Sequence, residues 1–142
     1  MLRRLLFALL PMLMLMACVG DDEPEVRTLV VAGDPVPHFE VVLSDGSAVS
    51  SQSLLGSWYV LVFFDTSCND CRRELPRLEQ LHNLRPELPL LCISRGEDVA
   101  EVSAYWSENR FTMPYSAQPD ATLYHRFATA GVPRLYIINS AG

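Results

Sequence analysis

The chain has too few cysteines for a disulfide scaffold and no hydrophobic run long enough to span a membrane. Its 142 residues include only four cysteines, too few for the framework of disulfide bridges that holds together a small secreted domain. The longest apolar run, residues 5–17, falls short of the roughly 20 residues that a transmembrane helix needs. Internal repeats and low-complexity segments are also missing. These absences exclude a disulfide scaffold and a repeat protein.

Basic residues are outnumbered as well. The 11 basic residues, all of them arginine, stand against 17 aspartate and glutamate residues, which gives a formal net charge of −6 at pH 7. A negative surface is repelled by nucleic-acid phosphates and by anionic lipid headgroups, so the sequence predicts no nucleic-acid partner. Hydrophobic residues make up 49% of the chain and charged residues 20%, a balance that favours one packed globular domain over a disordered chain.

The first residues form a different kind of segment. Arg3 and Arg4 precede the apolar run, which ends on Leu15-Met16-Ala17-Cys18. A basic start, a short apolar stretch and small residues at its end predict a signal peptide over residues 1–17. The last four positions resemble the lipobox of bacterial lipoproteins, and this resemblance implies lipidation of Cys18. The alternative is that residues 1–17 are an ordinary secretory signal, in which case the presence of Cys18 after it is incidental.

Residues 18–32 are predicted to be the lipidated cysteine and an acidic, flexible tether without hydrophobic period. Modification of the lipoprotein type would supply several acyl chains, and stable anchoring takes more than one. The sequence therefore predicts a protein held by lipid in a bacterial cell envelope, on the periplasmic side or on the surface of the outer membrane.

Two of the cysteines stand where a strand pattern changes into a helix pattern. Residues 58–64 are apolar, aromatic and β-branched, and a polar turn separates them from a helical pattern. Cys68 and Cys71 fall on the first turn of that predicted helix, close enough to form a disulfide. The helix N-terminus and the charges of Arg72 and Arg73 favour a thiolate at Cys68. Cys68 is therefore the predicted nucleophile and Cys71 the resolving thiol.

Three stretches resemble the thioredoxin superfamily, and within it the TlpA/ResA-like branch of membrane-anchored, extracytoplasmic thiol-disulfide oxidoreductases. They are residues 63–76 around the cysteines, Gly131-Val132-Pro133 before a strand-like run, and residues 33–39. The resemblance implies a thioredoxin-like α/β fold with an N-terminal β-hairpin, occupying residues 33–142.

The same resemblance implies roles for further residues. Pro76 matches the proline that bends the active-site helix, and Glu74 matches a glutamate placed near the thiols. Val132 and Pro133 match a loop whose cis proline lies against the disulfide and whose backbone pairs with an extended substrate segment. Glu74 is thus a candidate proton acceptor for the resolving thiol. As an ordinary residue of the first helical turn, Glu74 would only interact favourably with the helix dipole.

The sequence departs from the family pattern at the active site. Ser67 replaces the tryptophan that usually precedes the first cysteine, and Asn69 and Asp70 replace a proline-containing pair between the cysteines. The negative charge of Asp70 opposes thiolate formation. Val62 replaces the acid that thioredoxin buries beneath its thiols, which leaves Glu74 as the candidate proton acceptor.

Periodicity and helix breakers predict the remaining elements. They are a hairpin from residues 39–43 and 47–50, a helix over 69–83, a parallel strand over 88–94, a helix opened by residues 94–98 with Val99, Val102 and Trp106 on one face, a short helix capped by Asp120, and a strand over 134–138. Domains of the family continue with another strand and a helix, whereas this sequence stops at Gly142. We therefore expect the C-terminal strand and helix to be missing and the last strand to form an open sheet edge.

Metal binding is the main alternative for the paired cysteines. A structural zinc site needs four ligands, but Cys92, His38, His82 and His125 show no second paired spacing. Cys92 lies in an apolar run and is predicted to be a buried hydrophobic residue. A copper-delivery relative of thioredoxin would use a distant histidine such as His125, but its two cysteines are spaced more widely. The sequence therefore predicts no metal and no organic cofactor.

The predicted reaction is dithiol-disulfide exchange with a disulfide-bearing protein substrate, with this protein as the reductant and a membrane thiol donor upstream. Two alternatives stay open. A peroxiredoxin-like peroxide reductase would activate one cysteine with a threonine and an arginine, and Thr66 lies one residue closer to Cys68 than that pattern requires. A redox-inert binding lipoprotein would use the thioredoxin shape without the chemistry.

Overall fold

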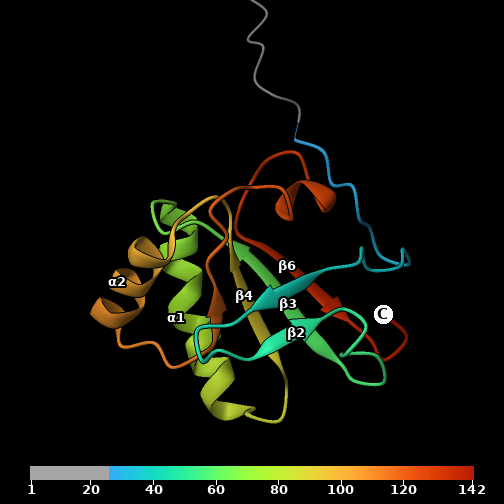
Figure 1. Ribbon diagram of the computed structural model, residues 1–142, viewed down its shortest axis with the longest axis horizontal. Coiled ribbons are helices and arrows are strands. Elements are labelled where there is room, and N and C mark those ends of the chain that lie inside the picture. The colour runs from blue at the N-terminus through green and yellow to red at the C-terminus, as the bar shows by residue number, and fades with distance from the viewer. Residues whose placement is uncertain (1–25) are drawn as a thin grey trace, which may run out of the picture.

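The computed structural model describes residues 26–142 (Figure 1). The predicted signal peptide, the lipidation site Cys18 and the tether up to residue 25 lie outside the described residues. In the part of the chain that is described, no helix is both long and apolar enough to cross a membrane. The described residues form a central sheet with helices on one face and a β-hairpin on the other, which confirms the predicted α/β class.

A four-stranded sheet forms the centre of the fold. Its strands are β3 (Tyr59–Phe64), β4 (Leu90–Ser94), β5 (Tyr115–Ser116) and β6 (Arg134–Ile138). They are ordered β5-β4-β3-β6. β4 lies parallel to β3, as expected for strands that are joined by a helix, and β6 runs antiparallel to β3. The strand that leads to Cys68 therefore lies in the middle of the sheet.

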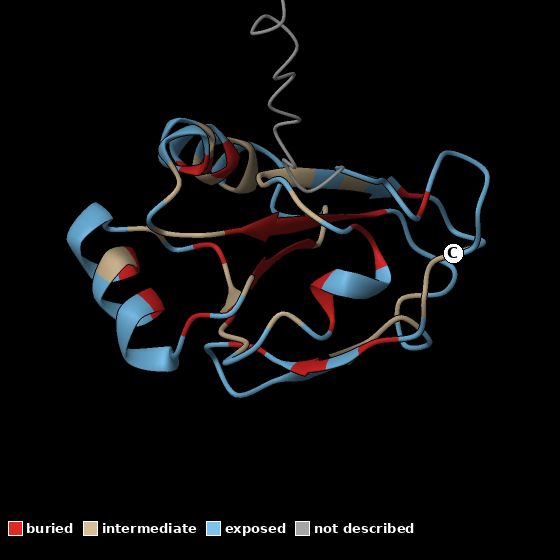
Figure 2. Cartoon of the chain, turned by 90° about the horizontal axis from the view of Figure 1, so that it is seen from above, coloured by how far each residue is buried: buried red, intermediate tan, exposed pale blue. Residues whose placement is uncertain are grey.

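Helices and a hairpin cover the two faces of this sheet. They are α1 (Asn69–Leu84), α2 (Val99–Asn109), the 3₁₀ helix η2 (Tyr124–Arg126) and the hairpin strands β1 (Glu40–Val42) and β2 (Ala48–Ser50). α1 and α2 pack on one face, while the hairpin and η2 pack on the other. In Figure 2 the central strands are buried, and the helices turn exposed sides outward. The predicted N-terminal hairpin is thereby confirmed.

The alternation of side chains along β3 explains the two layers. Leu61 and Phe63 belong to the core under the hairpin and η2, whereas Val62 and Phe64 belong to the core under α1 and α2. Every residue of β3 is buried, as is usual for a central strand covered on both faces. Packing on two sides fixes the end of β3, from which the turn to Cys68 departs.

The structure corrects several predicted details. β3 begins at Tyr59, and Trp58 is 58% exposed. Val99 is 66% exposed because the core contacts of α2 begin one turn later, at Val102. Asp120 accepts a hydrogen bond from the backbone N–H of Thr122 and stabilises the turn before η2, so the prediction that it caps a helix was wrong. α1 continues to Leu84 and β4 starts only at Leu90.

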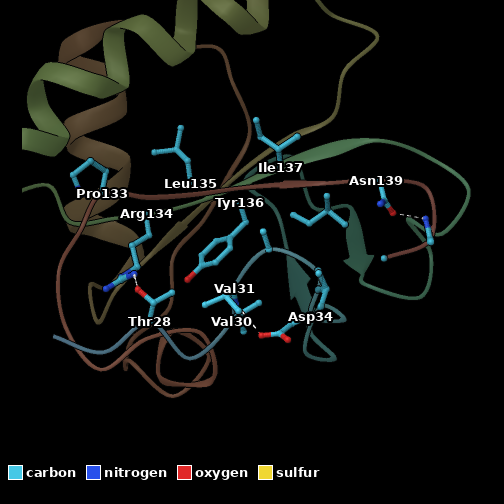
Figure 3. Close-up of a pocket in the computed structure, with 16 residues that line it drawn as sticks. Thr28, Val30, Val31, Asp34, Pro133, Arg134, Leu135, Tyr136, Ile137 and Asn139 are labelled. Atoms are coloured by element: carbon cyan, nitrogen blue, oxygen red, sulfur yellow. Dashed lines mark hydrogen bonds between the residues drawn. The ribbon is translucent and has the colours of Figure 1, made fainter.

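β6 leaves one edge of the described sheet open, as predicted. Leu135 and Ile137 are 44% and 76% exposed. Figure 3 shows these two side chains on one side of β6, and Arg134 and Tyr136 on the other side, toward the part of a groove that Thr28, Val30, Val31 and Asp34 also line. The open edge thus presents unpaired backbone together with apolar side chains.

Candidate active site

The two cysteines of the motif lie at the N-terminus of α1, directly after β3. Cys68 is the N-cap residue and Cys71 belongs to the first turn of the helix. The backbone N–H of Cys71 donates to Cys68 Sγ at 3.4 Å. Both thiols are free, so the site is in its dithiol form. Cys68 therefore lies at the N-terminus of α1, the end at which a helix dipole favours negative charge.

The two thiols differ in their exposure to solvent. Cys68 is half-buried, whereas Cys71 is fully buried in the core between α1 and the sheet. Burial, reinforced by the neighbouring Cys68, raises the pKa of Cys71 to about 12. Cys71 therefore remains protonated at neutral pH, and Cys68 is the thiol that a substrate can reach.

The loop before β6 lies against the thiols. The Val132–Pro133 peptide bond is cis, which confirms this part of the prediction. Cys68 Sγ donates to the carbonyl oxygen of Val132 at 3.4 Å. The Tyr124 hydroxyl group donates to the carbonyl oxygen of Gly131 at 2.8 Å, which ties the loop to η2. The fold thus brings the predicted substrate-contact residues next to the predicted nucleophile.

Asp65 closes the turn between β3 and α1. Its Oδ1 accepts hydrogen bonds from the backbone N–H of Ser67 at 2.8 Å and from the Ser67 hydroxyl group at 2.6 Å. Its Oδ2 pairs with Arg95 at 3.3 Å. Burial by itself would raise the pKa of Asp65, but the bonds from Ser67 and Arg95 outweigh burial and lower the pKa. Asp65 is therefore an ionised residue that shapes the turn before Cys68.

A second carboxylate, Glu97, contacts the same turn from the loop between β4 and α2. Glu97 is only 8% exposed. Its two oxygens accept from the backbone N–H of Thr66 at 3.0 and 3.1 Å, and Oε1 also accepts from the Thr66 hydroxyl group. Burial raises the pKa of Glu97 by more than these bonds lower it.

Sequence reasoning missed Glu97 because it treated residues 94–98 only as the opening of a helix. The helix starts at Val99 with Asp98 as its N-cap residue, so Glu97 precedes the helix. The one available signal was its position just after β4, since neighbouring parallel strands end at the same edge of a sheet. A polar residue there faces the turn that follows β3.

Two of the charged side chains that were predicted to act near the thiols, Glu74 and Asp70, pair with arginines of α1. Glu74 Oε2 accepts from Arg77 at 3.0 Å, and the Glu74 side chain is 31% exposed. Asp70 forms an exposed ion pair with Arg73, which offsets the negative charge that was expected to oppose thiolate formation. The role of Glu74 as a proton acceptor stays a prediction, and it would require Glu74 to release Arg77.

The third described cysteine and two of the histidines have contacts apart from this chemistry. Cys92 is fully buried, and its Sγ contacts Met113 Sδ at 3.8 Å; the prediction of a buried hydrophobic residue is confirmed. Burial raises the pKa of the Cys92 thiol. His38 contacts the Ser51 hydroxyl group and His125 contacts the carbonyl oxygen of Ala128. Within residues 26–142, no three histidine, cysteine or acidic side chains are grouped to hold a metal ion.

Residues 32–142 match the family model described as the AhpC/TSA family. The chain belongs to this family. A related protein is the thiol-disulfide oxidoreductase ResA of Halalkalibacterium halodurans, which is 22% identical over 118 residues, covering 82% of this chain and 67% of that protein. The Arabidopsis thaliana protein named "Probable nucleoredoxin 1" is 28% identical over 132 residues, which cover 87% of this chain. The same match spans only 22% of the length of the Arabidopsis protein.

Solved structures support the same assignment. A Bacteroides thetaiotaomicron protein described as a candidate protein disulfide isomerase superposes with a TM-score of 0.75 at 29% identity, over 82% of this chain and 77% of that chain. A thiol:disulfide interchange protein of Chlorobium tepidum gives a TM-score of 0.66 at 27% identity, over 82% and 81% of the two chains. The fold is thus thioredoxin-like, as predicted. These findings assign the chain to the thiol-disulfide oxidoreductases of the thioredoxin superfamily.

Proposed function

We propose that this AhpC/TSA-family protein reduces disulfides of protein substrates outside the cytosol. The observation that carries the proposal is the unequal pair of thiols: Cys68 is accessible at the N-terminus of α1, and Cys71 is buried with a raised pKa. An accessible nucleophile and a protected resolving thiol suit an exchange in two steps. The description of the ResA relatives as thiol-disulfide oxidoreductases supports the same chemistry.

The proposed exchange begins with attack of the Cys68 thiolate on one sulfur of the substrate disulfide. The bond between Cys68 and that sulfur forms while the substrate disulfide breaks, and the second substrate sulfur leaves as a thiolate. Cys71, once deprotonated, then attacks Cys68 Sγ and displaces the first substrate sulfur. The Cys68–Cys71 disulfide remains, and two electrons have passed to the substrate.

The mixed disulfide itself prepares Cys71 for the second step. In the dithiol form, the neighbouring Cys68 adds to burial in raising the pKa of Cys71. Once Cys68 is part of a disulfide it carries no charge, so this contribution disappears and the pKa of Cys71 falls. Burial still opposes ionisation, and we therefore propose Glu74 or a water molecule as the proton acceptor.

Val132 and Pro133 are the proposed substrate contacts. The Val132 carbonyl group already accepts a hydrogen bond from Cys68 Sγ, so a substrate that reaches this sulfur must pass beside the loop. An extended peptide can pair its backbone with an exposed backbone segment, and such pairing binds without reference to most side chains. This arrangement suits a protein that acts on disulfides in unfolded or flexible segments.

The proposed place of action is the cell envelope of a bacterium. The pattern of residues 1–17 and the lipobox resemblance at Cys18 support a lipid anchor on the tether of residues 18–32. The oxidised protein needs two electrons per turnover, and a membrane thiol-reducing protein is the proposed donor. We expect the full chain to incorporate labelled fatty acid in a bacterial host, and Cys18→Ser to incorporate none. Equal labelling of both proteins would refute the anchor.

A trapping experiment tests the exchange. Cys71→Ser lacks the resolving thiol, so we expect it to hold substrate proteins as mixed disulfides that separate on addition of a strong reductant. Cys68→Ser should trap nothing, and Cys92→Ser is the matched control for a buried cysteine outside the motif. The proposal fails if Cys71→Ser and Cys68→Ser yield the same disulfide-linked species.

The same proteins test the two alternatives. The Thr66 hydroxyl group donates to Glu97 rather than to Cys68, which disfavours activation of the thiol by Thr66 as in a peroxiredoxin. Peroxide consumption that Cys71→Ser retains and Cys68→Ser loses, without any trapped protein, would favour peroxide reduction. Absence of a reversible Cys68–Cys71 couple in graded thiol buffers would favour a redox-inert binding module.

A further inference from the structure

Glu97 is the one buried charged residue among residues 26–142. A carboxylate at 8% exposure is costly unless hydrogen bonds compensate for lost water. All three bonds that its side chain accepts come from one residue, Thr66. The cost of burying this charge is therefore offset at a single place, which is the turn between β3 and α1.

Thr66 connects Glu97 to the turn that carries Cys68. It lies between Asp65 and the N-cap residue Cys68, whose backbone N–H donates to the carbonyl oxygen of Asp65 at 3.2 Å. The carbonyl oxygen of Thr66 accepts from Arg72 Nε at 2.7 Å. Glu97 holds the N–H and hydroxyl groups of Thr66, and α1 holds its carbonyl group. The turn that presents Cys68 is thus fixed from both sides.

Glu97 is itself held in place by the sheet. Its backbone N–H donates to the carbonyl oxygen of Gln118 at 2.8 Å, and its carbonyl oxygen accepts from the Ser94 hydroxyl group at 3.5 Å. Ser94 in turn accepts from the backbone N–H of Gln118 at 2.8 Å. Glu97 therefore contacts the active-site turn through its carboxylate, and the end of β4 and the segment after β5 through its backbone N–H and carbonyl groups.

We propose that Glu97 is a positioning residue for thiol-disulfide exchange, which acts through Thr66 to hold Cys68 in the geometry of attack. The inference rests on the proposed function of the Cys68–Cys71 pair. An attacking sulfur must approach the substrate disulfide along a narrow range of directions, so a loosened turn lowers the rate even where the thiol stays accessible. Glu97 needs no contact with the substrate for this role.

The test measures the second-order rate constant with which the reduced full chain reacts with oxidised glutathione. Loss of the contacts to Thr66 should slow the reaction of Glu97→Ala by about tenfold or more, the effect of one or two hydrogen bonds. Glu97→Gln keeps one acceptor oxygen and should fall between Glu97→Ala and the parent protein. Glu101→Gln is the matched control: Glu101 accepts only from the backbone N–H of Asp98, in the capping box of α2, so its rate constant should stay within about twofold of the parent's.

A double-mutant cycle separates positioning from a general loss of stability. Thr66→Val removes the hydroxyl donor but keeps the backbone N–H that also donates to Glu97. It should slow exchange by a smaller factor in Glu97→Ala than in the parent protein, because the bond from the Thr66 hydroxyl group is already lost in Glu97→Ala. The inference would be overturned if folded Glu97→Ala or Glu97→Gln reacted with the same rate constant as Glu101→Gln. It would also be overturned if Thr66→Val slowed exchange by the same factor in Glu97→Ala as in the parent protein. If Glu97→Ala does not fold, Glu97→Gln decides the matter.

Failure of the inference and failure of the proposed function give different results. Oxidised glutathione is not a protein substrate, so Glu97 can control its reaction even where Cys71→Ser traps no protein. The opposite pattern, with trapped proteins and no effect of Glu97, would keep the proposed function and remove the positioning role. A parent protein that does not react with oxidised glutathione, together with a Cys71→Ser variant that traps no protein, would overturn both.

Discussion

Cys68 and Cys71 are close in sequence and differ in environment, and this difference defines the site at the scale of single residues. Cys68 caps α1 and touches the loop at Val132, whereas Cys71 lies in the core. The same helix start that stabilises charge on the first sulfur takes the second sulfur away from water. The order of the two thiols in the reaction follows from this placement.

Alkylation should report this difference directly. We expect iodoacetamide at neutral pH to modify Cys68 at least about a hundredfold faster than Cys71, because a thiol with a pKa of about 12 is almost wholly protonated there. Cys92, which is fully buried, should also resist modification in the folded protein. Mass spectrometry of peptides over a time course measures the three rates, and equal rates for Cys68 and Cys71 would contradict the structure.

Tyr59 carries a buried hydroxyl group that has no hydrogen-bond partner among residues 26–142. Tyr59→Phe removes this unpaired group and keeps the ring, so the free energy of unfolding should stay the same or rise by about 1 kcal/mol. Tyr124→Phe is the control, because the Tyr124 hydroxyl group donates to the carbonyl oxygen of Gly131; its loss should lower the free energy of unfolding by about 1–2 kcal/mol. Urea denaturation compares the two, and a clear loss of stability in Tyr59→Phe would show a partner for its hydroxyl group.

At the scale of elements, Glu79 connects α1 to the segment before β5. Its Oε1 accepts from the backbone N–H and hydroxyl groups of Thr112 at 2.9 and 2.6 Å, and its Oε2 accepts from the backbone N–H of Met113 at 3.0 Å. Burial alone would raise the pKa of Glu79, but these hydrogen bonds lower it on balance. The carboxylate thus acts as a clamp that depends on its charge.

Acid should release this clamp. The pKa of Glu79 is lower in the folded chain than its ordinary value of 4.5, so its contribution to stability is complete above that value and is lost as the pH falls through the folded pKa. Glu79→Gln should lower the free energy of unfolding by about 1–3 kcal/mol at pH 7. The difference in free energy of unfolding between this variant and the parent protein should become smaller near pH 3. Glu108→Gln, an exposed change on α2, is the control for urea denaturation at both pH values, and a gap that widens in acid would refute the clamp.

At the scale of the whole molecule, the open edge at β6 and the net negative charge have opposite effects on association between copies of the chain. Ile137, at 76% exposure, offers apolar surface beside strand backbone that no other described strand pairs with, which favours pairing between copies of the chain. A formal charge of −6 at pH 7 makes copies repel one another. Association should therefore grow as salt screens this repulsion.

Ile137→Lys tests the edge as the route of association. A charge on an edge strand disfavours pairing, so we expect this variant to scatter less light than the parent protein in high salt, with a free energy of unfolding within about 0.5 kcal/mol of the parent's. Val42→Lys makes the same change of charge at a 62% exposed position of β1 and is the matched control. Equal scattering by the two variants would place the contact elsewhere.

Much of this fold was predictable because its signals are local. The apolar run of β3, the helix from Asn69, the hairpin around residues 44–46 and the final strand at Arg134 all follow from patterns within a few residues. Element ends were less certain, as Trp58 and Val99 show, because burial at an end depends on whether another element covers it. The cis bond at Pro133 was predictable from the family resemblance and not from proline chemistry alone.

The sequence by itself determined the cysteine spacing, the strand that leads to it and the helix that follows, since each depends on neighbours along the chain. Only the tertiary structure decided which distant groups meet there. Pairing of β3 with β4 brings Glu97 to Thr66, and pairing of β3 with β6 brings Val132 to Cys68. It also decided that Cys71 is buried, because the burial of a side chain is set by all the elements that pack around it.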